Sequence, residues 1–302
     1  MKFVEITKNT NIDFIGFRYK MLVLSCILVL LGIVGFVMIS IGKANLSVDF
    51  TGGTQLQLGF SKQVSIGDLR KALISGGVDD VQIQEISGKN EFFIKTKMID
   101  SDKERVQDKI NAILSNEFKE TGSRILGSNM VGSTVGKQLK RNAIIAIAIS
   151  LVCIVIYIAW RFTFIFGLAA TIATFHDVLS ILGIFYILNM EMNILFITAV
   201  LTIAGYSLTD TVVVFDRIRE NMAKMKSKTE LGTVINRSIN EVLSRTLVTS
   251  ITTLVAVGAI LVLGGKVLFD FSLALFIGII VGTYSSVFVA SPLVYMWRQR
   301  VR

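Results

Sequence analysis

The sequence has few of the residues that form disulfides, hold metals or break helices. Its 302 residues include two cysteines, one histidine and one proline, which are Cys26, Cys153, His176 and Pro292. A disulfide framework needs several cysteines, and a zinc site needs three or four nitrogen or sulfur ligands close together. We therefore expect no disulfide framework, no metal and no cofactor. The two cysteines fall in apolar runs, which is typical of small packing residues.

Charge is also scarce, because Asp, Glu, Lys and Arg make up 18% of the chain whereas hydrophobic residues make up 52%. This balance is typical of a membrane protein with a soluble insert and argues against an ordinary soluble enzyme. A helix crosses ~30 Å of hydrocarbon with about 20 apolar residues. Four stretches of that length carry no charge, and two more are interrupted by one or two ionisable residues. The six predicted spans are 21–42, 142–160, 162–190, 192–215, 246–265 and 271–297.

The distribution of Lys and Arg predicts the orientation of these spans. With the N-terminus in the cytoplasm, fifteen Lys and Arg residues fall in the inside segments, whereas the short outside loops 189–192 and 264–269 carry only Lys266. Cytoplasmic loops are enriched in these residues, so both termini are expected in the cytoplasm. The net charge of +9 is then a consequence of topology. No nucleic-acid-binding motif accompanies it, and we expect no nucleic-acid partner.

The expected domain organisation follows from the spans. It comprises a short cytoplasmic segment at 1–20, the first span at 21–42, an extracytoplasmic α+β domain at 43–137, and a five-helix membrane region at 138–302 with a cytoplasmic loop at 216–245.

The pattern of the outer domain predicts a small sheet covered by helices. Gly52 and Gly53 predict a turn, since they lack the Gly-Lys-Ser/Thr ending of a phosphate loop. The expected elements are a strand within 48–58, a helix from Ser65 to about 75, strands at 81–86 and 91–97, a helix from Ser101 to about 118, and a weak strand at 124–127. This β-α-β-β-α-β order is that of a ferredoxin-like split βαβ unit.

One carboxylate, Asp210, is the only charge within the fourth predicted span. An acidic residue near the centre of a membrane helix costs roughly 2.5–3.5 kcal/mol on insertion scales, so it faces a protein interior or water, and function is the default hypothesis. On a helix Tyr206, Ser207 and Arg217 share its face, which makes one polar stripe.

A second ionisable pair, His176-Asp177, lies within the third predicted span. Small and polar residues share the Asp177 face, so that face is predicted to point into the helix bundle. They are Ala170, Ala173, Thr174 and Ser180. The pair is either a buried His-Asp contact bonded to neighbouring helices or part of a proton path.

A cation, Arg245, stands at the start of the fifth predicted span. It either extends to the cytoplasmic interface along its own helix or turns inward and pairs with a carboxylate.

Two stretches together resemble one known family. Val48-Asp-Phe-Thr-Gly-Gly-Thr54 follows the first span, and Gly205-Tyr-Ser-Leu-Thr-Asp-Thr-Val-Val-Val-Phe-Asp-Arg-Ile-Arg-Glu-Asn221 lies in the fourth. Both resemble motifs of the SecF family, which belongs to the SecD/SecF proteins of the RND superfamily. The longer motif is specific, and the order of one span, an outer domain and five further spans resembles the family from end to end. The motif residues singled out are Asp49, Gly52, Gly53, Gly205, Tyr206 and Asp216.

The resemblance implies a role in protein transport rather than an enzymatic reaction, with no catalytic residue. It implies a subunit of the bacterial cytoplasmic (inner) membrane that forms one six-span half of an RND-type bundle, with SecD supplying the other half. The pair would use the proton-motive force to complete preprotein translocation through SecYEG after SecA-driven insertion, with YajC as a further candidate partner. The family's proton path carries over to Asp210. The other proton-coupling candidates are Arg245, Asp177, His176 and Arg217.

The residues also suggest a mechanism. Apolar surroundings favour the neutral form of a carboxyl group and a nearby guanidinium favours the charged form, so an arginine that moved relative to Asp210 would switch its protonation. We expect this switch to change helix packing and to tilt the outer domain through the first span. Sodium is an alternative ion, because Ser207, Thr209 and Thr211 offer oxygens near Asp210. Two alternative functions are a non-catalytic assembly subunit and half of a small RND-type exporter.

Overall fold

The computed structural model describes residues 10–78, 81–86, 89–96, 103–225 and 230–301. The chain divides into two compact units, of which Leu46–Ile144 is one and Met1–Asn45 with Ile145–Arg302 is the other. The first nine residues of the predicted N-terminal segment and Ser101, the predicted helix cap, lie outside the described residues.

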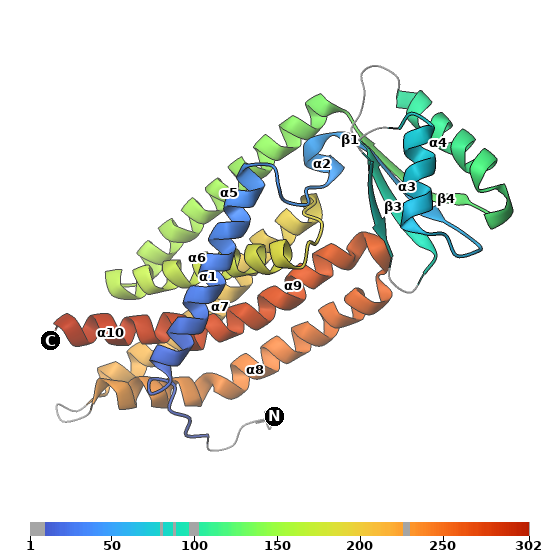
Figure 1. Ribbon diagram of the computed structural model, residues 1–302. Coiled ribbons are helices and arrows are strands. Elements are labelled where there is room, and N and C mark those ends of the chain that lie inside the picture. The colour runs from blue at the N-terminus through green and yellow to red at the C-terminus, as the bar shows by residue number, and fades with distance from the viewer. Residues whose placement is uncertain (1–9, 79–80, 87–88, 97–102, 226–229, 302) are drawn as a thin grey trace. The chain divides into compact units, whose positions relative to one another are not determined.

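Six helices among the described residues are long and apolar enough to cross a membrane, which confirms the six predicted spans (Figure 1). The last span is interrupted by a π-helical turn, η2. The elements are α1 (Arg18–Ser40), α5 (Ser133–Arg161), α6 (Phe164–Ile187), α7 (Ile194–Ala223), α8 (Leu231–Leu263), and α9 (Gly265–Ser285), η2 (Ser286–Ala290) and α10 (Ser291–Val301).

The segment 216–245, which the sequence predicts as a loop, is helical at both ends, since α7 continues to Ala223 and α8 starts at Leu231. Ion pairs along each helix support these polar turns, namely Lys224 with Glu220 at 2.6 Å and Arg237 with Glu241 at 2.8 Å. Pairs at this i, i+4 spacing stabilise a helix by a few tenths of a kcal/mol each.

Helices α6, α7 and α9 form the centre of the membrane unit. Of the most apolar 18 residues in each span, 56% are buried in α6 but 6% in α5. Small residues allow the central packing, because backbones in membranes approach most closely where side chains are small. A Cβ atom on Gly183 of α6 would lie 2.5 Å from the backbone nitrogen of Gly32 on α1, so the two helices touch through their backbones there.

The second unit is a four-stranded antiparallel sheet with strand order β2-β3-β1-β4. This is the order of a ferredoxin-like fold, so the predicted fold class is confirmed. Its elements are β1 (Gly53–Gly59), α3 (Ile66–Ser75), β2 (Val81–Glu85), β3 (Glu91–Thr96), α4 (Lys103–Glu117), a 3₁₀ turn η1 (Lys119–Thr121) and β4 (Arg124–Val131). Alternate residues Leu56 and Leu58 of β1 are fully buried and join Leu69, Leu73 and Ile110 of the helices in one core.

The start of this unit differs from the predicted strand at 48–58. Residues Val48–Thr51 form a helical turn, α2, in which the Ser47 hydroxyl accepts a hydrogen bond from the Asp49 N–H at 3.2 Å. The predicted turn at Gly52 and Gly53 is present, with φ angles of 70° and 128° that favour glycine. A Cβ atom on Gly52 would also lie 2.8 Å from the Ser133 Cα atom. The glycine pair therefore ends the turn and starts β1 beside the beginning of α5.

Candidate functional site

The Asp177 carboxylate joins three central helices. Its side chain is fully buried on α6, where Oδ1 lies 2.9 Å from Nδ1 of His176. Its Oδ2 accepts hydrogen bonds from the hydroxyl of Ser207 on α7 and, at 2.8 Å, from the hydroxyl of Ser285 on α9. Both carboxylate oxygens are thus satisfied, which a buried charged or polar group requires. The prediction that the Asp177 face points into the bundle is confirmed, since the neighbouring Ala173 is also buried.

The Asp210 carboxylate is held by fewer contacts. Its Oδ1 accepts a hydrogen bond from the Thr246 hydroxyl of α8 at 2.7 Å. Its Oδ2 is buried and has no hydrogen-bond partner among the described residues. The adjacent hydroxyl of Ser286 pairs with that of Thr211 at 2.9 Å. Among the described residues, Thr246 is thus the one geometrically clear hydrogen-bond donor to this carboxylate, and the Ser286 hydroxyl lies beside it.

A π-helical turn brings serines to both carboxylates. Ser285 ends α9 and bonds Asp177, and Ser286 begins η2 beside Asp210. Pro292 follows one turn later and lacks the N–H that a regular helix would use. The Ser291 hydroxyl, just before the proline, donates to the Ser286 carbonyl at 2.9 Å. π-turns of this kind are frequent at functional sites.

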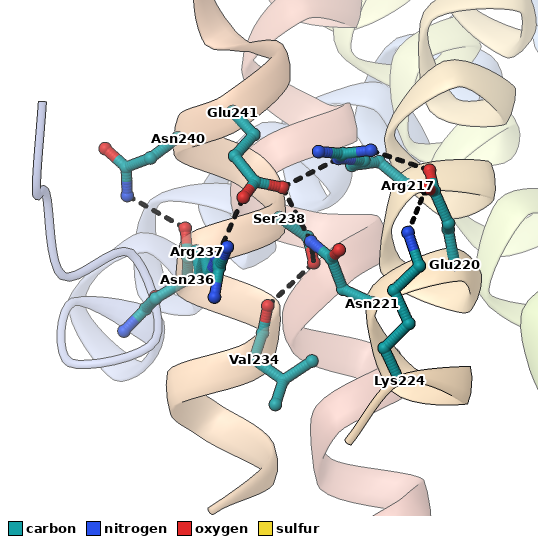
Figure 2. A network of polar contacts seen from close by, with 10 residues as sticks. All are labelled: Arg217, Glu220, Asn221, Lys224, Val234, Asn236, Arg237, Ser238, Asn240 and Glu241. Atoms are coloured by element: carbon teal, nitrogen blue, oxygen red, sulfur yellow. Dashed lines mark hydrogen bonds and ion pairs between the residues drawn. The ribbon is translucent and has the colours of Figure 1, made fainter. Parts of the chain in front are cut away.

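The two candidate arginines lie in different surroundings. Arg245 directly precedes Thr246 on α8, is exposed, and attracts the Asp210 carboxylate electrostatically without forming an ion pair among the described residues. Arg217 does not pair with Asp210, although the sequence places both residues on the same face of the helix. It donates instead to Glu241 at 2.7 Å and to Glu220 at 2.6 Å (Figure 2). Arg217 therefore joins the ends of α7 and α8.

The hydroxyls that suggested a sodium site do not converge on Asp210. Ser207 donates to Asp177, Thr209 donates to the Gly205 carbonyl at 3.1 Å, and Thr211 pairs with Ser286. Within the described part of the chain, no group of three His, Cys, Asp or Glu residues is placed to hold a metal ion.

The remaining motif residues of α7 are spread along the helix. Gly205 is exposed, and a Cβ atom added there would meet nothing within 4 Å. The Tyr206 hydroxyl donates to the Thr253 hydroxyl at 3.5 Å, a long contact. Asp216 pairs with Arg161 of α5 at 2.6 Å as well as with Arg219 at 3.6 Å.

Small and polar side chains form one exposed stripe on α7 and another on α8. The exposed positions recur every three or four residues, so each set forms one stripe along its helix. They are Thr198, Thr202, Gly205 and Thr209 on α7, and Arg245, Thr249, Thr252 and Ala256 on α8. We call these residues the α7/α8 face. Faces of small residues allow close helix approach in membranes.

Sequence reasoning missed Ser285 and Ser286, which lie in the apolar stretch 271–297. The available signal was a Ser-Ser pair seven residues before the single proline of the chain. It did not reveal which helix the serines would face.

Two family models match the sequence. The C-terminal model of the protein export membrane proteins SecD/SecF matches residues 111–300, which include Asp177 and Asp210. The SecD/SecF GG motif matches residues 39–64, which include Gly52 and Gly53.

Relatives with established names share the same architecture. A protein translocase subunit SecF from Thermodesulfovibrio yellowstonii is 50% identical over 294 residues, covering 97% of each chain. A protein translocase subunit SecDF from Thermus thermophilus is 42% identical over 262 residues, or 85% of this chain and 35% of SecDF. The crystal structure of a SecDF from Thermus, titled a translocon-associated membrane protein, superimposes with a TM-score of 0.85 at 37% identity. That match covers 97% of this chain and 39% of the SecDF chain. The chain therefore belongs to the SecD/SecF family of protein export membrane proteins, and within it to the SecF translocase subunits.

Proposed function

We propose that this membrane protein works with SecD in the bacterial cytoplasmic (inner) membrane, with both termini in the cytoplasm. The pair uses the proton-motive force to complete the passage of a preprotein through SecYEG after SecA has inserted it, and YajC is a further candidate partner. Asp210 is the proton-coupling residue of this chain.

The half-bonded state of Asp210 carries the proposal. A proton carrier has to be stable enough in both its charged and its neutral form. Among the described residues, one oxygen of Asp210 is held by Thr246, whereas the other has no hydrogen-bond partner within bonding geometry and only the Ser286 hydroxyl nearby. The guanidinium of Arg245 is next in sequence to that threonine, so a small rotation of α8 changes its distance from the carboxylate. An approaching guanidinium favours the charged form of a carboxyl group, and a receding one favours the neutral form.

The partnership with SecD rests on two observations. The Thermus thermophilus relative is a SecDF, of which this chain matches 35% of the length, as expected for one part of a two-part machine. The α7/α8 face is also exposed in this chain alone, and its threonine hydroxyls are bonded within their own helices, as for Thr198 and Thr202. We assign this face to the helices of SecD. Asp210 and Arg245 would then lie at the junction of the two halves.

The coupling to the outer unit runs through α1. Asp177 links α7 to α6, and α6 touches α1 through Gly183 and Gly32. Because the chain continues from α1 directly into the outer unit, a shift of α7 that displaces α1 would be passed on along the chain. A membrane potential supplies about 2.3 kcal/mol per charge per 100 mV for such a shift. If a rigid cross-link between the outer unit and SecD left gradient-driven export intact, this route would be ruled out.

The test is completion of preprotein export in inverted membrane vesicles with and without a proton gradient. We compare wild type with Asp210→Asn, after co-purification has established that SecD is still bound. The matched control is Asp108→Asn, at an exposed aspartate of α4. We expect Asp210→Asn to abolish the gradient-dependent step and the control to retain it.

Two results would contradict the proposal. Retained gradient dependence in Asp210→Asn would make Asp210 a structural hydrogen-bond acceptor and favour the assembly-subunit alternative. An export step that depends on an imposed sodium gradient, but not on a proton gradient, would show that sodium is the coupling ion.

A further inference from the structure

A second polar site lies at the end of the membrane unit where α5 ends and α6 begins. It is a cavity of about 750 Å³, and α7 and α10 complete its wall. Its charged lining includes Arg161, Arg219 and Arg298, and its apolar lining includes Phe166 and Met222. Three guanidinium groups from three different helices thus open onto one cavity.

The charges of the cavity do not balance. Asp216 pairs with Arg161 at 2.6 Å and with Arg219 at 3.6 Å, so one carboxylate serves two arginines. Arg298 has no carboxylate partner among the described residues and instead contacts the Met222 sulfur at 3.9 Å. The other acid of the lining, Glu220, already has two cations of its own, Arg217 and Lys224. The site therefore keeps an excess of positive charge.

The guanidinium groups are positioned by two buried aromatic rings, those of Phe162 and Phe166. Arg161 and Arg219 lie 5.0 and 5.7 Å from the ring centre of Phe162, and Arg298 lies 5.8 Å from that of Phe166. Both rings are buried and stack against each other at 6.4 Å. Such cation–π contacts fix the arginines before a ligand arrives, so less side-chain entropy is lost on binding.

The neighbouring exposed aromatics indicate the depth of this cavity in the membrane. Trp160 is 85% exposed and Phe164 is 83% exposed, and they flank Arg161 along the chain. Exposed aromatic residues at the end of a membrane helix are typical of the level of the lipid headgroups. The cavity thus opens at the depth of lipid phosphates, and the exposed rings beside it suit acyl chains.

The geometry points to a binding site for the phosphate headgroup of an anionic phospholipid, formed by Arg161, Arg219 and Arg298. Guanidinium groups bind phosphate oxygens through paired charge-assisted hydrogen bonds. Basic pockets between membrane helices are suited to anionic headgroups, whereas a zwitterionic headgroup adds no net charge to compensate the arginines. This site is separate from Asp210 and does not depend on the proposed ion coupling.

The test uses the full-length protein in nanodiscs of zwitterionic phosphatidylcholine. Brominated phosphatidylglycerol, or brominated phosphatidylcholine as the reference, is titrated in while tryptophan quenching is recorded. Trp160 and Trp297 are the only tryptophans, and each is next in sequence to an arginine of the site. We expect half-maximal quenching at a mole fraction of the anionic lipid at least tenfold below that of the zwitterionic lipid.

The variant Arg298→Gln removes the arginine without a carboxylate partner and leaves both pairs of Asp216 intact. We expect it to weaken the anionic preference about fivefold, which is the usual contribution of one cation near a membrane surface. Arg219→Gln should act in the same direction and serves if Arg298→Gln does not fold. The matched control is Arg237→Gln, at an arginine whose side chain is 73% exposed on α8 and which does not line the cavity.

Three outcomes would overturn the assignment. One is equal quenching by the two lipids in wild type. Another is an equal loss in Arg237→Gln and in both cavity variants, which would indicate general surface charge. The third is complete displacement of the anionic lipid by millimolar inorganic phosphate, which would identify a site for a soluble phosphate.

Discussion

Asp177 and Asp210 are carboxylates on adjacent helices of one apolar bundle, and they differ in how many hydrogen-bond partners they have. Asp177 has a donor or a ring nitrogen at each oxygen, supplied by three helices. Asp210 has a donor at one oxygen. A fully bonded buried carboxylate stabilises one arrangement of helices. A carboxyl group with fewer donors depends more on the charges that approach it for the balance between its charged and neutral forms. This difference is the basis of our proposal that Asp210 takes part in ion coupling and that Asp177 has a structural role, and the following changes would break or sharpen the comparison.

The largest expected effect is on stability, from Asp177→Leu. Removing this carboxylate leaves His176 and Ser207 without the partner shown here and deprives Ser285 of one of its two acceptors, so we expect a loss of about 3–5 kcal/mol in the free energy of unfolding. Asp210→Leu should cost well under half of that amount, because among the described residues the clear hydrogen bond that it removes is the one from Thr246. Unfolding of the purified protein in mixed detergent micelles measures both. Equal losses of unfolding free energy in the two variants would contradict a structural role that is specific to Asp177.

A smaller loss of stability is expected from Gly282→Ala. A Cβ atom at this position would lie 2.9 Å from the Ser207 Cβ atom, so the serine that donates to Asp177 or the backbone of α9 has to shift. Overpacking of this kind costs about 1–3 kcal/mol. The same unfolding experiment measures it, and a variant as stable as wild type would show that the serine contact is loose.

Substitution of Gly205, the glycine near Asp210, should affect stability in the opposite way from substitution of Gly282. Gly205→Ala meets open space, so the chain alone should be unchanged or stabilised by up to about 1 kcal/mol through better helix propensity. If SecD covers the α7/α8 face, the added methyl group lies in the interface and should weaken co-purification of SecD. Unchanged association would place the interface elsewhere.

The smallest effect concerns an exposed carboxylate, Asp13, which serves as a reference for the buried ones. It accepts hydrogen bonds from the Gly16 N–H at 2.9 Å and from the Asn236 side chain at 2.6 Å, and both lower its pKa in the folded protein. A lowered pKa stabilises the fold above the unfolded value of about 4, and this contribution is lost as the pH falls through the folded pKa. Hydrogen exchange of the Gly16 amide, corrected for intrinsic rates, should lose protection only below about pH 4. Asp13→Asn should remove that pH dependence. If the protection of the Gly16 amide in this variant followed the same pH profile as in wild type, the prediction would be wrong.

The sequence predicted the features that depend on local patterns. Apolar length predicted the spans, and alternation with turn residues predicted the order of strands and helices in the outer unit. The face of Asp177 was also predictable, because small residues at helical spacing are themselves a local pattern.

The contacts between helices were not predictable in the same way. Arg217 lies on the Asp210 stripe, yet Glu241 of the next helix offers a nearer charge. Ser285 and Ser286 depend on a π-turn, whose position follows from packing as well as from Pro292. The helical turn at Val48–Thr51 was missed because its cap, Ser47, lies in a stretch whose apolar alternation resembles a strand.

The π-turn at Ser286–Ala290 also gives the last membrane span one extra residue within its helix. A π-turn holds one residue more than the α-helix around it, and an α-helix advances about 100° and 1.5 Å per residue. If the turn returned to regular α geometry, α10 would rotate by about that angle relative to α9. Such a rotation would move Arg298 relative to the other arginines of its cavity, so the turn that lies beside Asp177 and Asp210 also determines where that arginine is placed.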